Sequence, residues 1–354
     1  MTDLSSPEAI GGADRSGMLD AVLGLPVQCR EGYRLGRAIQ NQPDASGLGS
    51  VVVCGMGGSG VVGDVLRALY RDRLGIPIDV VKDSVLPEFC GKDTLVVCSS
   101  FSGNTAETVA CFEAAVAAGC RVVAMTSGGE LAGRASDRGL PVVAIPARGI
   151  PKPRAALGLL VFGAVGALEQ MGLVPGALDE VEESIALLDV LAAELRPGSA
   201  KNPAVEIAEW LGDRPVVVWG AEGIGAVAAT RWKTQLNENA KTPAFASSLP
   251  ELDHNEIVGW TGRAGERFAL VAIRHEGERR DVAARFSVSM EIAAASGLEA
   301  REVRARGRSS FARFLSVVML GDATSVYLGL LRGHDPTPIE NIDRLKRLLD
   351  ERPG

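Results

Sequence analysis

Short apolar runs alternate along this chain with longer stretches of helical periodicity. The short runs are rich in valine and isoleucine and are bounded by glycine, proline or polar residues, which is typical of buried β-strands. Strands that alternate with helices predict an α/β fold with parallel, doubly wound sheets. The predicted strands span residues 49–54, 77–81, 94–98, 121–126, 140–145, 215–219, 268–273 and 299–303. The clearest helical patterns lie at residues 18–39, 105–118, 130–138, 155–171, 178–195 and 282–295.

One unit of strand, glycine-rich turn and helix occurs twice, at Val51–Val62 and at Val216–Val227. We therefore predict two α/β subdomains, each built on a mostly parallel sheet that is flanked by helices. The N-terminus is polar and acidic, so we expect it to be disordered. The predicted units are residues 1–17 as a disordered tail, 18–170 as the first subdomain, 171–200 as a helical connection and linker, and 201–354 as the second subdomain.

The segment Ser99–Thr108 reads SSFSGNTAET and lies between a predicted strand and a predicted helix. Ser100, Ser102 and Thr105 supply short hydroxyl groups where the first free N–H groups of the helix point outward. These amides and the positive end of the helix dipole favour a bound anion. The loop contains no lysine, so a phosphate monoester suits it better than the nucleotide of a Walker-type site. A helix cap without a ligand is the alternative that this loop leaves open.

A second candidate loop, Gly55–Gly60, reads GMGGSG and follows the first predicted strand. It satisfies the G-x-G-x-x-G pattern of dinucleotide-binding folds, and Asp79 lies roughly where a ribose-binding acid is expected. However, Ser59 places a hydroxyl next to Gly58 inside the turn. Two hydroxyl-bearing loops on one face suit a single phosphate with its polyol, whereas a dinucleotide also needs apolar room for adenine. We favour a sugar phosphate, with a dinucleotide as the second candidate.

Composition narrows the class of protein. The net charge of −7 argues against a nucleic-acid surface as the main function. One local arginine cluster alternates with apolar or small residues, which is typical of a strand edge or a solvated face; it consists of Arg301, Arg304, Arg306 and Arg308. The longest apolar run, Ala155–Leu168, is too short to span a bilayer and predicts a buried helix. We expect a cytoplasmic protein that binds neither nucleic acid nor a membrane.

The six cysteines and three histidines show no metal-ligand spacing. All six cysteines fall within the first 120 residues, and Cys54 and Cys98 end apolar strand-like runs, where cysteine acts as a small hydrophobic residue. The sequence therefore predicts no metal site, no cofactor and no disulfide framework.

The Gly-Ser turn followed by S-x-S-G-N-T resembles the sugar isomerase (SIS) fold. In the second half, N-E-N-A-K at Asn237–Lys241 and P-E-L-D-H-N-E-I-V-G at Pro250–Gly259 resemble the archaeal and bacterial bifunctional phosphoglucose/phosphomannose isomerases. The closing segment LLRGHDPTPIENIDRLK and Pro26-Val27-Gln28 are similar to the same family. The resemblance covers nearly the whole chain, and the two segments of the second half are its most specific part. It implies two SIS-type subdomains.

The resemblance also implies roles for individual residues. Glu238 matches the family's catalytic base, and His254 matches a histidine that assists ring opening from the neighbouring subunit of a dimer. Arg154 matches an arginine near the reacting carbons, with Arg148 as the alternative match. Lys346 resembles a C-terminal lysine that approaches the sugar. The implied phosphate site consists of Gly58, Ser59, Ser100, Ser102 and Thr105.

The implied function is an aldose–ketose isomerase that interconverts glucose 6-phosphate, and mannose 6-phosphate, with fructose 6-phosphate through an enediol. The residue types suit this chemistry, because a positioned glutamate such as Glu238 can move a proton between C1 and C2. A histidine such as His254 can be tuned by its acidic neighbours, and an arginine can stabilise a developing oxyanion. Two other functions stay open: a non-catalytic regulator that binds sugar phosphates, and a dinucleotide-dependent oxidoreductase.

Overall fold

The computed structural model describes residues 2–352, and its first sheet has five parallel strands in the order β2-β1-β3-β4-β5. In a sheet of this order the chain winds in opposite directions from β1 and from β3, so a crevice for ligands forms at their carboxyl ends. Both loops that the sequence singles out follow these two strands. The strands are β1 (Ser50–Cys54), β2 (Ile78–Val81), β3 (Thr94–Ser99), β4 (Arg121–Thr126) and β5 (Val142–Ala144).

The second sheet has four parallel strands in the order β7-β6-β8-β9. Here β6 has neighbours on both sides and is followed by a glycine-rich turn, as β1 is in the first sheet. The predicted fold of two parallel sheets is confirmed. The strands are β6 (Val216–Ala221), β7 (Ala244–Leu249), β8 (Ala269–Arg274) and β9 (Glu299–Arg304).

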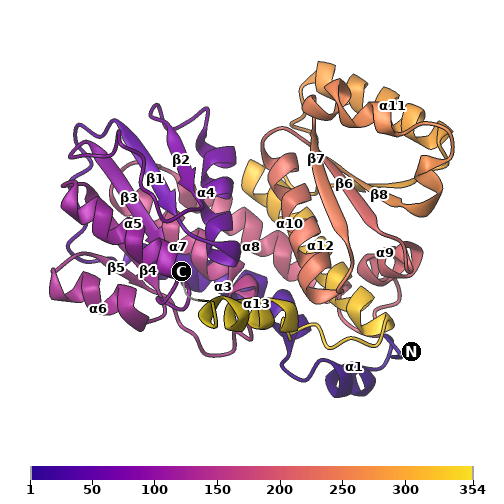
Figure 1. The fold of residues 1–354 in the computed structure, drawn as a ribbon, viewed down its shortest axis with the longest axis horizontal. Coiled ribbons are helices and arrows are strands. Elements are labelled where there is room, and N and C mark those ends of the chain that lie inside the picture. Colours follow the sequence, from indigo (N-terminus) through magenta and orange to yellow (C-terminus); the bar gives the residue numbers. More distant parts are fainter. Residues whose placement is uncertain (1, 353–354) are drawn as a thin grey trace.

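Helices lie on both faces of each sheet and fill the region between the two sheets (Figure 1). The α-helices before the linker are α1 (Pro7–Ala13), α2 (Met18–Leu23), α3 (Leu25–Arg37), α4 (Gly57–Tyr70), α5 (Ala106–Ala117), α6 (Gly129–Asp137), α7 (Leu157–Gln170) and α8 (Ala177–Glu194). Those after it are α9 (Pro203–Leu211), α10 (Ile224–Asn239), α11 (Arg280–Ala295), α12 (Ser310–Leu331) and α13 (Glu340–Asp350). Residues 2–352 also contain four 3-10 turns: η1 (Pro153–Ala155), η2 (Glu251–His254), η3 (Glu256–Gly259) and η4 (Ala264–Arg267).

One hydrophobic cluster joins the two sheets. Because side chains alternate along a strand, Val51 and Val53 of β1 face this cluster, as do Val216 and Val218 of β6. The other face of the first sheet, including Val52, packs against α5 and α6 in a separate cluster. The two subdomains therefore share one core, and the expected connection between them contributes the helix α8 to that core.

The N-terminal segment differs from the expected disordered tail. Residues 7–13 form α1, and the Ser6 hydroxyl caps this helix by accepting a hydrogen bond from the Ala9 N–H. Leu4 and Ile10 are buried against the shared core, and the Asp14 carboxylate accepts hydrogen bonds from the first N–H groups of α2. The segment is polar on average, but its apolar residues Leu4 and Ile10 are spaced so that both pack against the shared core.

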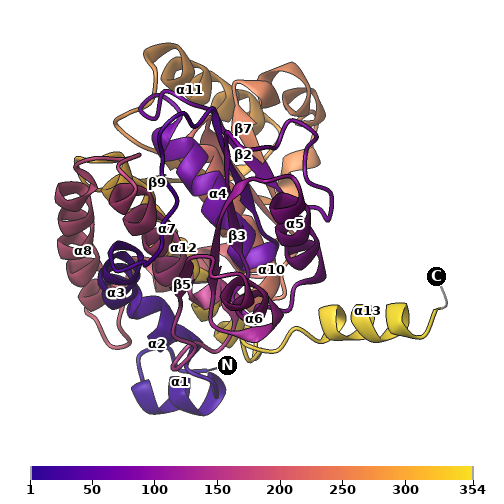
Figure 2. The same cartoon turned by 90° about the vertical axis from the view of Figure 1, so that its left-hand side faces the viewer.

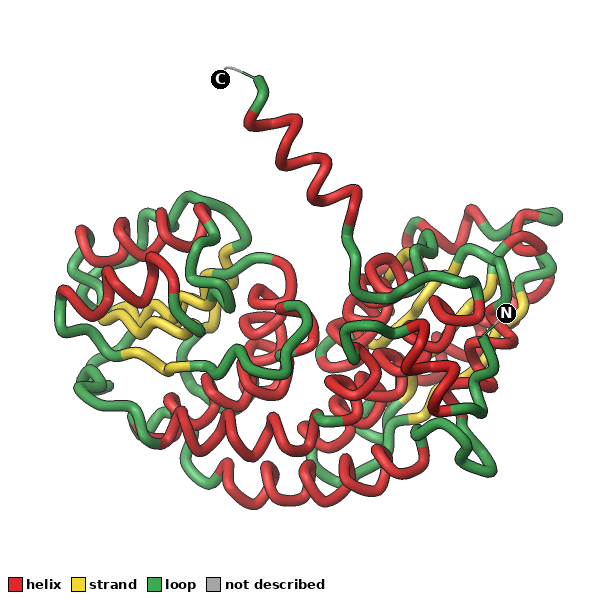
Figure 3. The backbone as a smooth tube through the Cα atoms, turned by 90° about the horizontal axis from the view of Figure 1, so that it is seen from below, coloured by secondary structure: helices red, strands yellow, loops and turns green. Residues whose placement is uncertain are grey.

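Two helices near the C-terminus have opposite environments. By length and composition α12 could cross a membrane, but 89% of its most apolar window is buried in the fold, as in a core helix. In contrast, α13 projects away from the rest of the chain (Figures 2 and 3). It buries none of its residues and exposes Ile342, Leu345 and Leu349.

The arginine cluster lies along and just after β9, which is the edge strand of the second sheet. Arg304 pairs with Glu302, Arg306 pairs with Glu194, and Arg308 lies near Glu183. Arg301 covers the ring of Trp210. The predicted solvated strand edge is confirmed, and acidic partners or an aromatic ring account for each of these positive charges.

Candidate active site

The hydroxyl loop after β3 folds around Ser100, whose side chain is fully buried. Its Oγ lies 2.8 Å from Thr105 Oγ1 and accepts a hydrogen bond from the Gly103 N–H at 3.1 Å. Thr105 is the N-cap residue of α5, yet its side chain makes no capping hydrogen bond to the helix. Ser102 is exposed at the loop tip. The threonine hydroxyl therefore contacts Ser100 and does not cap α5.

The glycine loop after β1 is joined to the hydroxyl loop by one hydrogen bond. The Phe101 N–H donates to Ser59 Oγ at 3.0 Å, and Ser59 is buried. A Cβ atom on Gly58 would lie 2.9 Å from both the Cα and the N of Arg154, so glycine is required for this close approach. The two loops and the turn that carries Arg154 thus meet at the carboxyl ends of β1 and β3.

Arg154 is the most heavily engaged side chain at this junction, and only 3% of it is exposed. Its Nε donates to Asn239 Oδ1 at 2.8 Å, and Nη1 donates to Glu238 Oε2 at 3.1 Å. Its Nη2 donates to the backbone carbonyls of Pro336 at 2.8 Å and Thr337 at 3.1 Å. Burial lowers the pKa of Arg154 and Glu238 opposes that shift; an arginine keeps its charge in proteins.

The two candidate arginines have different surroundings. Arg148 is exposed and makes no hydrogen bond or ion pair within residues 2–352. Arg154 touches the carboxylate of Glu238, although 84 positions separate the two residues in the chain. Of the two matches that the sequence allows, Arg154 is the one beside the proposed base.

Glu238 comes from the second subdomain. It lies in the last turn of α10, a helix that packs against both α4 and α12. Its side chain is 29% exposed, so the carboxylate is partly desolvated but open to a ligand. The arrangement places a fixed cation and a carboxylate next to the two loops for which the sequence predicts anion binding.

Two bacterial proteins are similar to this chain over most of its length. The bifunctional phosphoglucose/phosphomannose isomerase of Caldicellulosiruptor bescii is 34% identical over 338 residues, which cover 94% of this chain and 99% of that protein. The protein of the same name from Aquifex aeolicus is 35% identical and covers 84% of this chain and 90% of its own length. This chain belongs to the bifunctional phosphoglucose/phosphomannose isomerase family.

Further comparisons agree with this family. The family model described as the bacterial phospho-glucose isomerase C-terminal SIS domain matches residues 200–349. Among solved structures, a glucose-6-phosphate isomerase like protein from Thermus thermophilus superposes with a TM-score of 0.63 at 19% identity, covering 98% of this chain and 99% of that one. The C-terminal domain of glucosamine-fructose-6-phosphate aminotransferase from Francisella tularensis superposes with a TM-score of 0.68 at 14% identity, covering 91% and 98%. At these identities the structures establish a shared fold.

His254 lies apart from Glu238 within the chain. The helix α10 runs back along β6, so Glu238 at its end is near the amino ends of the strands, where the Val216 N–H bonds Pro243 O. His254 instead follows the carboxyl end of β7 and is exposed in η2. A helix of 16 residues is about 24 Å long, so the two residues lie near opposite ends of the strands of the second sheet.

Lys346 also lies outside this cluster. It is an exposed residue of α13, which projects from the body of the molecule (Figure 3). It makes no hydrogen bond or ion pair within residues 2–352. For this member of the phosphoglucose/phosphomannose isomerase family, a single copy of the chain brings together Arg154, Glu238 and the loops, but neither His254 nor Lys346.

Sequence reasoning missed several residues that surround Arg154. Arg231 and Asp322 form a buried ion pair, and Arg231 Nη2 also donates to the carbonyl of Arg154 at 2.6 Å. Lys241 Nζ donates to the carbonyl of Glu238 and to Pro338 O, which ties the end of α10 to the segment before α13. Asn239 and Lys241 lie in the N-E-N-A-K motif, so the motif was a usable signal for them. No local pattern links Arg231 with Asp322.

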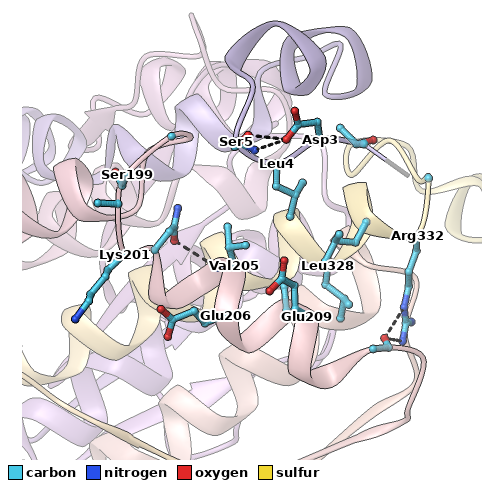
Figure 4. Close-up of a pocket in the computed structure, with 18 of the residues that line it drawn as sticks. Asp3, Leu4, Ser5, Ser199, Lys201, Val205, Glu206, Glu209, Leu328 and Arg332 are labelled. Atoms are coloured by element: carbon cyan, nitrogen blue, oxygen red, sulfur yellow. Dashed lines mark hydrogen bonds between the residues drawn. The ribbon is translucent and has the colours of Figure 1, made fainter.

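A cavity of about 1140 Å³ lies elsewhere, between the N-terminal segment, α9 and the C-terminal end of α12 (Figure 4). Leu4, Val205 and Leu328 contribute apolar lining, and Glu206 and Glu209 contribute carboxylates. None of the predicted site residues lines it. The candidate active site is therefore defined by its converging polar groups and not by this cavity. Within residues 2–352, no cluster of three or more His, Cys, Asp or Glu side chains has an arrangement that could hold a metal ion.

Proposed function

We propose that this chain interconverts glucose 6-phosphate, and also mannose 6-phosphate, with fructose 6-phosphate. The observation that carries the proposal is the contact between Glu238 and the buried guanidinium of Arg154, placed beside the two hydroxyl loops. A carboxylate that accepts a proton and a cation that stabilises the resulting negative charge are the two groups that an enediol mechanism requires. The curated relatives that share this chain's length carry the corresponding name.

In this scheme the phosphate of the sugar binds at the two loops. The N-termini of α4 and α5 have no side-chain caps, so their first amides are available to an anion. Ser59, Ser100, Ser102 and Thr105 add hydroxyl donors around those amides. The phosphate then holds the open-chain sugar with its C1 and C2 toward the second subdomain.

Glu238 removes the proton from C2 of the aldose and returns it to C1 of the enediol, while the hydroxyl proton on O2 is transferred to O1, giving the ketose. The bond from C2 to its hydrogen breaks and the electron pair moves toward the C1 oxygen, which becomes an enediolate. The charge of Arg154 stabilises that oxygen. Rotation about the C2–C3 bond lets the same base return a proton to either face of C2, so one site serves both aldoses.

We also propose that the active form is a homodimer in which His254 of one copy reaches the site of the other and assists ring opening. The separation of Glu238 and His254 along the strands of the second sheet supports this arrangement, because within one copy His254 lies away from Glu238. Lys346 would complete the same site once α13 has a surface to pack on. A cytoplasmic location stays a prediction.

A dinucleotide oxidoreductase has less support than the sequence allowed. Asp79 pairs with Val52 in the middle of neighbouring strands, whereas a ribose-binding acid belongs near the carboxyl end of its strand. A non-catalytic regulator would bind sugar phosphate without any use for a base, so the paired Glu238 and Arg154 favour the enzyme. One relative, the D-glucosamine-6-phosphate 4-epimerase of Sulfolobus acidocaldarius, is 30% identical over 62% of this chain and 66% of its own length, so the choice of reaction needs a direct assay.

The test is a coupled assay of the purified chain with glucose 6-phosphate and mannose 6-phosphate, each with fructose 6-phosphate as product. We expect turnover of both, unchanged after prolonged dialysis against a strong chelator. Turnover of neither, with a change in nicotinamide absorbance instead, would overturn the proposal. Activity lost on chelation and restored by zinc would overturn the metal-free scheme.

The shared site has its own test. We expect Glu238→Gln and His254→Ala each to be inactive alone, and mixtures that exchange subunits to recover part of the activity. A mixed dimer contains one site with both residues intact and one with neither. If proven mixed dimers recover nothing, His254 serves the site of its own chain.

A further inference from the structure

The guanidinium of Arg154 has five N–H groups, and the protein occupies four of them. Nε bonds Asn239, the two N–H groups of Nη2 bond the carbonyls of Pro336 and Thr337, and one N–H of Nη1 bonds Glu238. One N–H of Nη1 is therefore left over, on the nitrogen beside the proposed base. Because the guanidinium is planar and rigid, the groups that hold Nε and Nη2 decide where this remaining N–H points.

Asn239 is the one side chain that holds Nε. It is 99% buried, with a relative exposure of 1%, and its Oδ1 accepts from Arg154 Nε at 2.8 Å. Its Nδ2 donates to Ser325 Oγ at 2.9 Å, and Ser325 in turn donates to the carbonyl of Asp322 on α12. A chain of hydrogen bonds thus runs from the core helix α12 through Ser325 and Asn239 to Arg154.

We infer that Asn239 is a positioning residue, which aims the free Nη1–H of Arg154 at the oxygen that becomes negative during the reaction. This inference rests on the proposed isomerase function. The two asparagines that flank Glu238 therefore have different tasks. Asn237 donates to the carbonyl of Thr242 at 2.8 Å and does not touch Arg154, so it supports the end of α10 only.

The test is a double-mutant cycle between Asn239 and Arg154, with kcat and KM measured for glucose 6-phosphate. Loss of a hydrogen bond to a charged group changes an equilibrium or rate constant by about 10- to 100-fold. We therefore expect Asn239→Ala to lower kcat by that factor with KM nearly unchanged. Arg154→Lys already removes the planar fork, so adding Asn239→Ala to Arg154→Lys should lower kcat by less than about twofold. Asn237→Ala is the matched control, with kcat close to that of the unmodified chain.

Independent effects would overturn the inference: if Asn239→Ala lowers kcat equally with and without Arg154→Lys, Asn239 does not act through the arginine. A melting temperature for each variant separates misfolding from misplacement. Should Asn239→Ala fail to fold, Ser325→Ala is the variant to use, since it removes one of the two side chains that accept from Asn239 Nδ2, the other being Gln235, without touching Arg154. It should lower kcat several-fold in the Arg154 chain and leave kcat unchanged in the Arg154→Lys chain. A lack of turnover by the unmodified chain contradicts the proposed function instead, so the two failures are distinguishable.

Discussion

The two sheets contain the same unit of strand, glycine-rich turn and helix. In the first sheet the start of the helix lies at the candidate site, and in the second sheet the end of the helix does. In the first sheet, β1 leads through Gly55–Gly60 into α4, and the N-terminus of α4 faces the hydroxyl loop through the bond between Ser59 and Phe101. In the second sheet, β6 leads through Gly220–Gly225 into α10, and it is the far end of α10 that carries Glu238.

The glycine turns of both sheets pack backbone on backbone. A Cβ atom on Gly220 would lie 2.1 Å from the carbonyl oxygen of Gly225, and one on Gly60 would lie 2.6 Å from the carbonyl oxygen of Gly55. The two sheets differ at the end of the next strand. At the end of β8, the counterpart of β3, Arg274 forms a buried ion pair with Glu278 and covers the ring of Phe286. Arg274 also pairs with Glu302, so two carboxylates neutralise this guanidinium and none of its charge is left for a phosphate. The repeat has thus kept its fold in both halves, and the two halves supply different chemistry.

The largest loss of activity is expected at Glu238, the proposed base that the second subdomain supplies. The variant Glu238→Gln keeps the shape and the acceptor for Arg154 but cannot take up the C2 proton. General-base catalysis contributes about 10²- to 10⁴-fold, so turnover should fall by at least that factor while binding of the sugar phosphate is largely kept. A variant that exchanges the C2 proton with solvent at the original rate would remove Glu238 from the mechanism.

The next effect concerns the junction between the halves, where Arg231 and Asp322 are both buried and Arg231 also bonds the carbonyl of Arg154. The variant Asp322→Asn leaves the Arg231 charge uncompensated, and removing one partner of a buried pair costs about 3–5 kcal/mol. Denaturant unfolding should show that loss in the free energy of unfolding. Asp281→Asn, which breaks an exposed pair with Arg279, is the control and should leave stability unchanged. Equal effects of the two variants would contradict the role of the buried pair.

A smaller effect is expected at the open loop of the first sheet. The variant Ser102→Ala removes one hydroxyl donor to the phosphate, which corresponds to about 1.5–3 kcal/mol, or one to two decades in affinity. Because both aldoses share the phosphate, glucose 6-phosphate and mannose 6-phosphate should be weakened alike, as measured by titration calorimetry. Unchanged affinity for both would remove Ser102 from the phosphate site.

The smallest effect is expected at the glycine turn of the second sheet. Glu222 lies in that turn, and its side chain is 62% exposed and 3.8 Å from Arg71. The variant Glu222→Gln should change neither sugar-phosphate affinity nor turnover, since an exposed pair at this distance contributes little. A loss of affinity comparable to that of Ser102→Ala would show that both glycine turns bind the anion, and the contrast between the halves would fail.

The elements of this protein could be predicted because their signals are local. Apolar runs such as Thr94–Cys98 and the helical spacing of 178–195 fall within a few residues of β3 and α8. The hydroxyl loop is also contained in one stretch of chain, so its residues and its position at a strand end were readable. The N-terminal segment was the exception, since Leu4 and Ile10 acquire meaning only against a core built from distant helices.

The site itself depends on contacts between distant parts of the chain. The sequence by itself determined which residue types were available, including Glu238, Arg154 and the alternative match Arg148. Only the tertiary structure decided that Arg154 lies against Glu238 and that Asn239 holds Arg154. It also decided that Arg231 and Asp322, which are 91 positions apart, form an ion pair beside Arg154. It also separated His254 from Glu238 by placing them near opposite ends of the strands of one sheet. Local periodicity reports which face of an element is buried, whereas the pairing of two buried polar groups depends on how whole elements pack, and no periodicity encodes that.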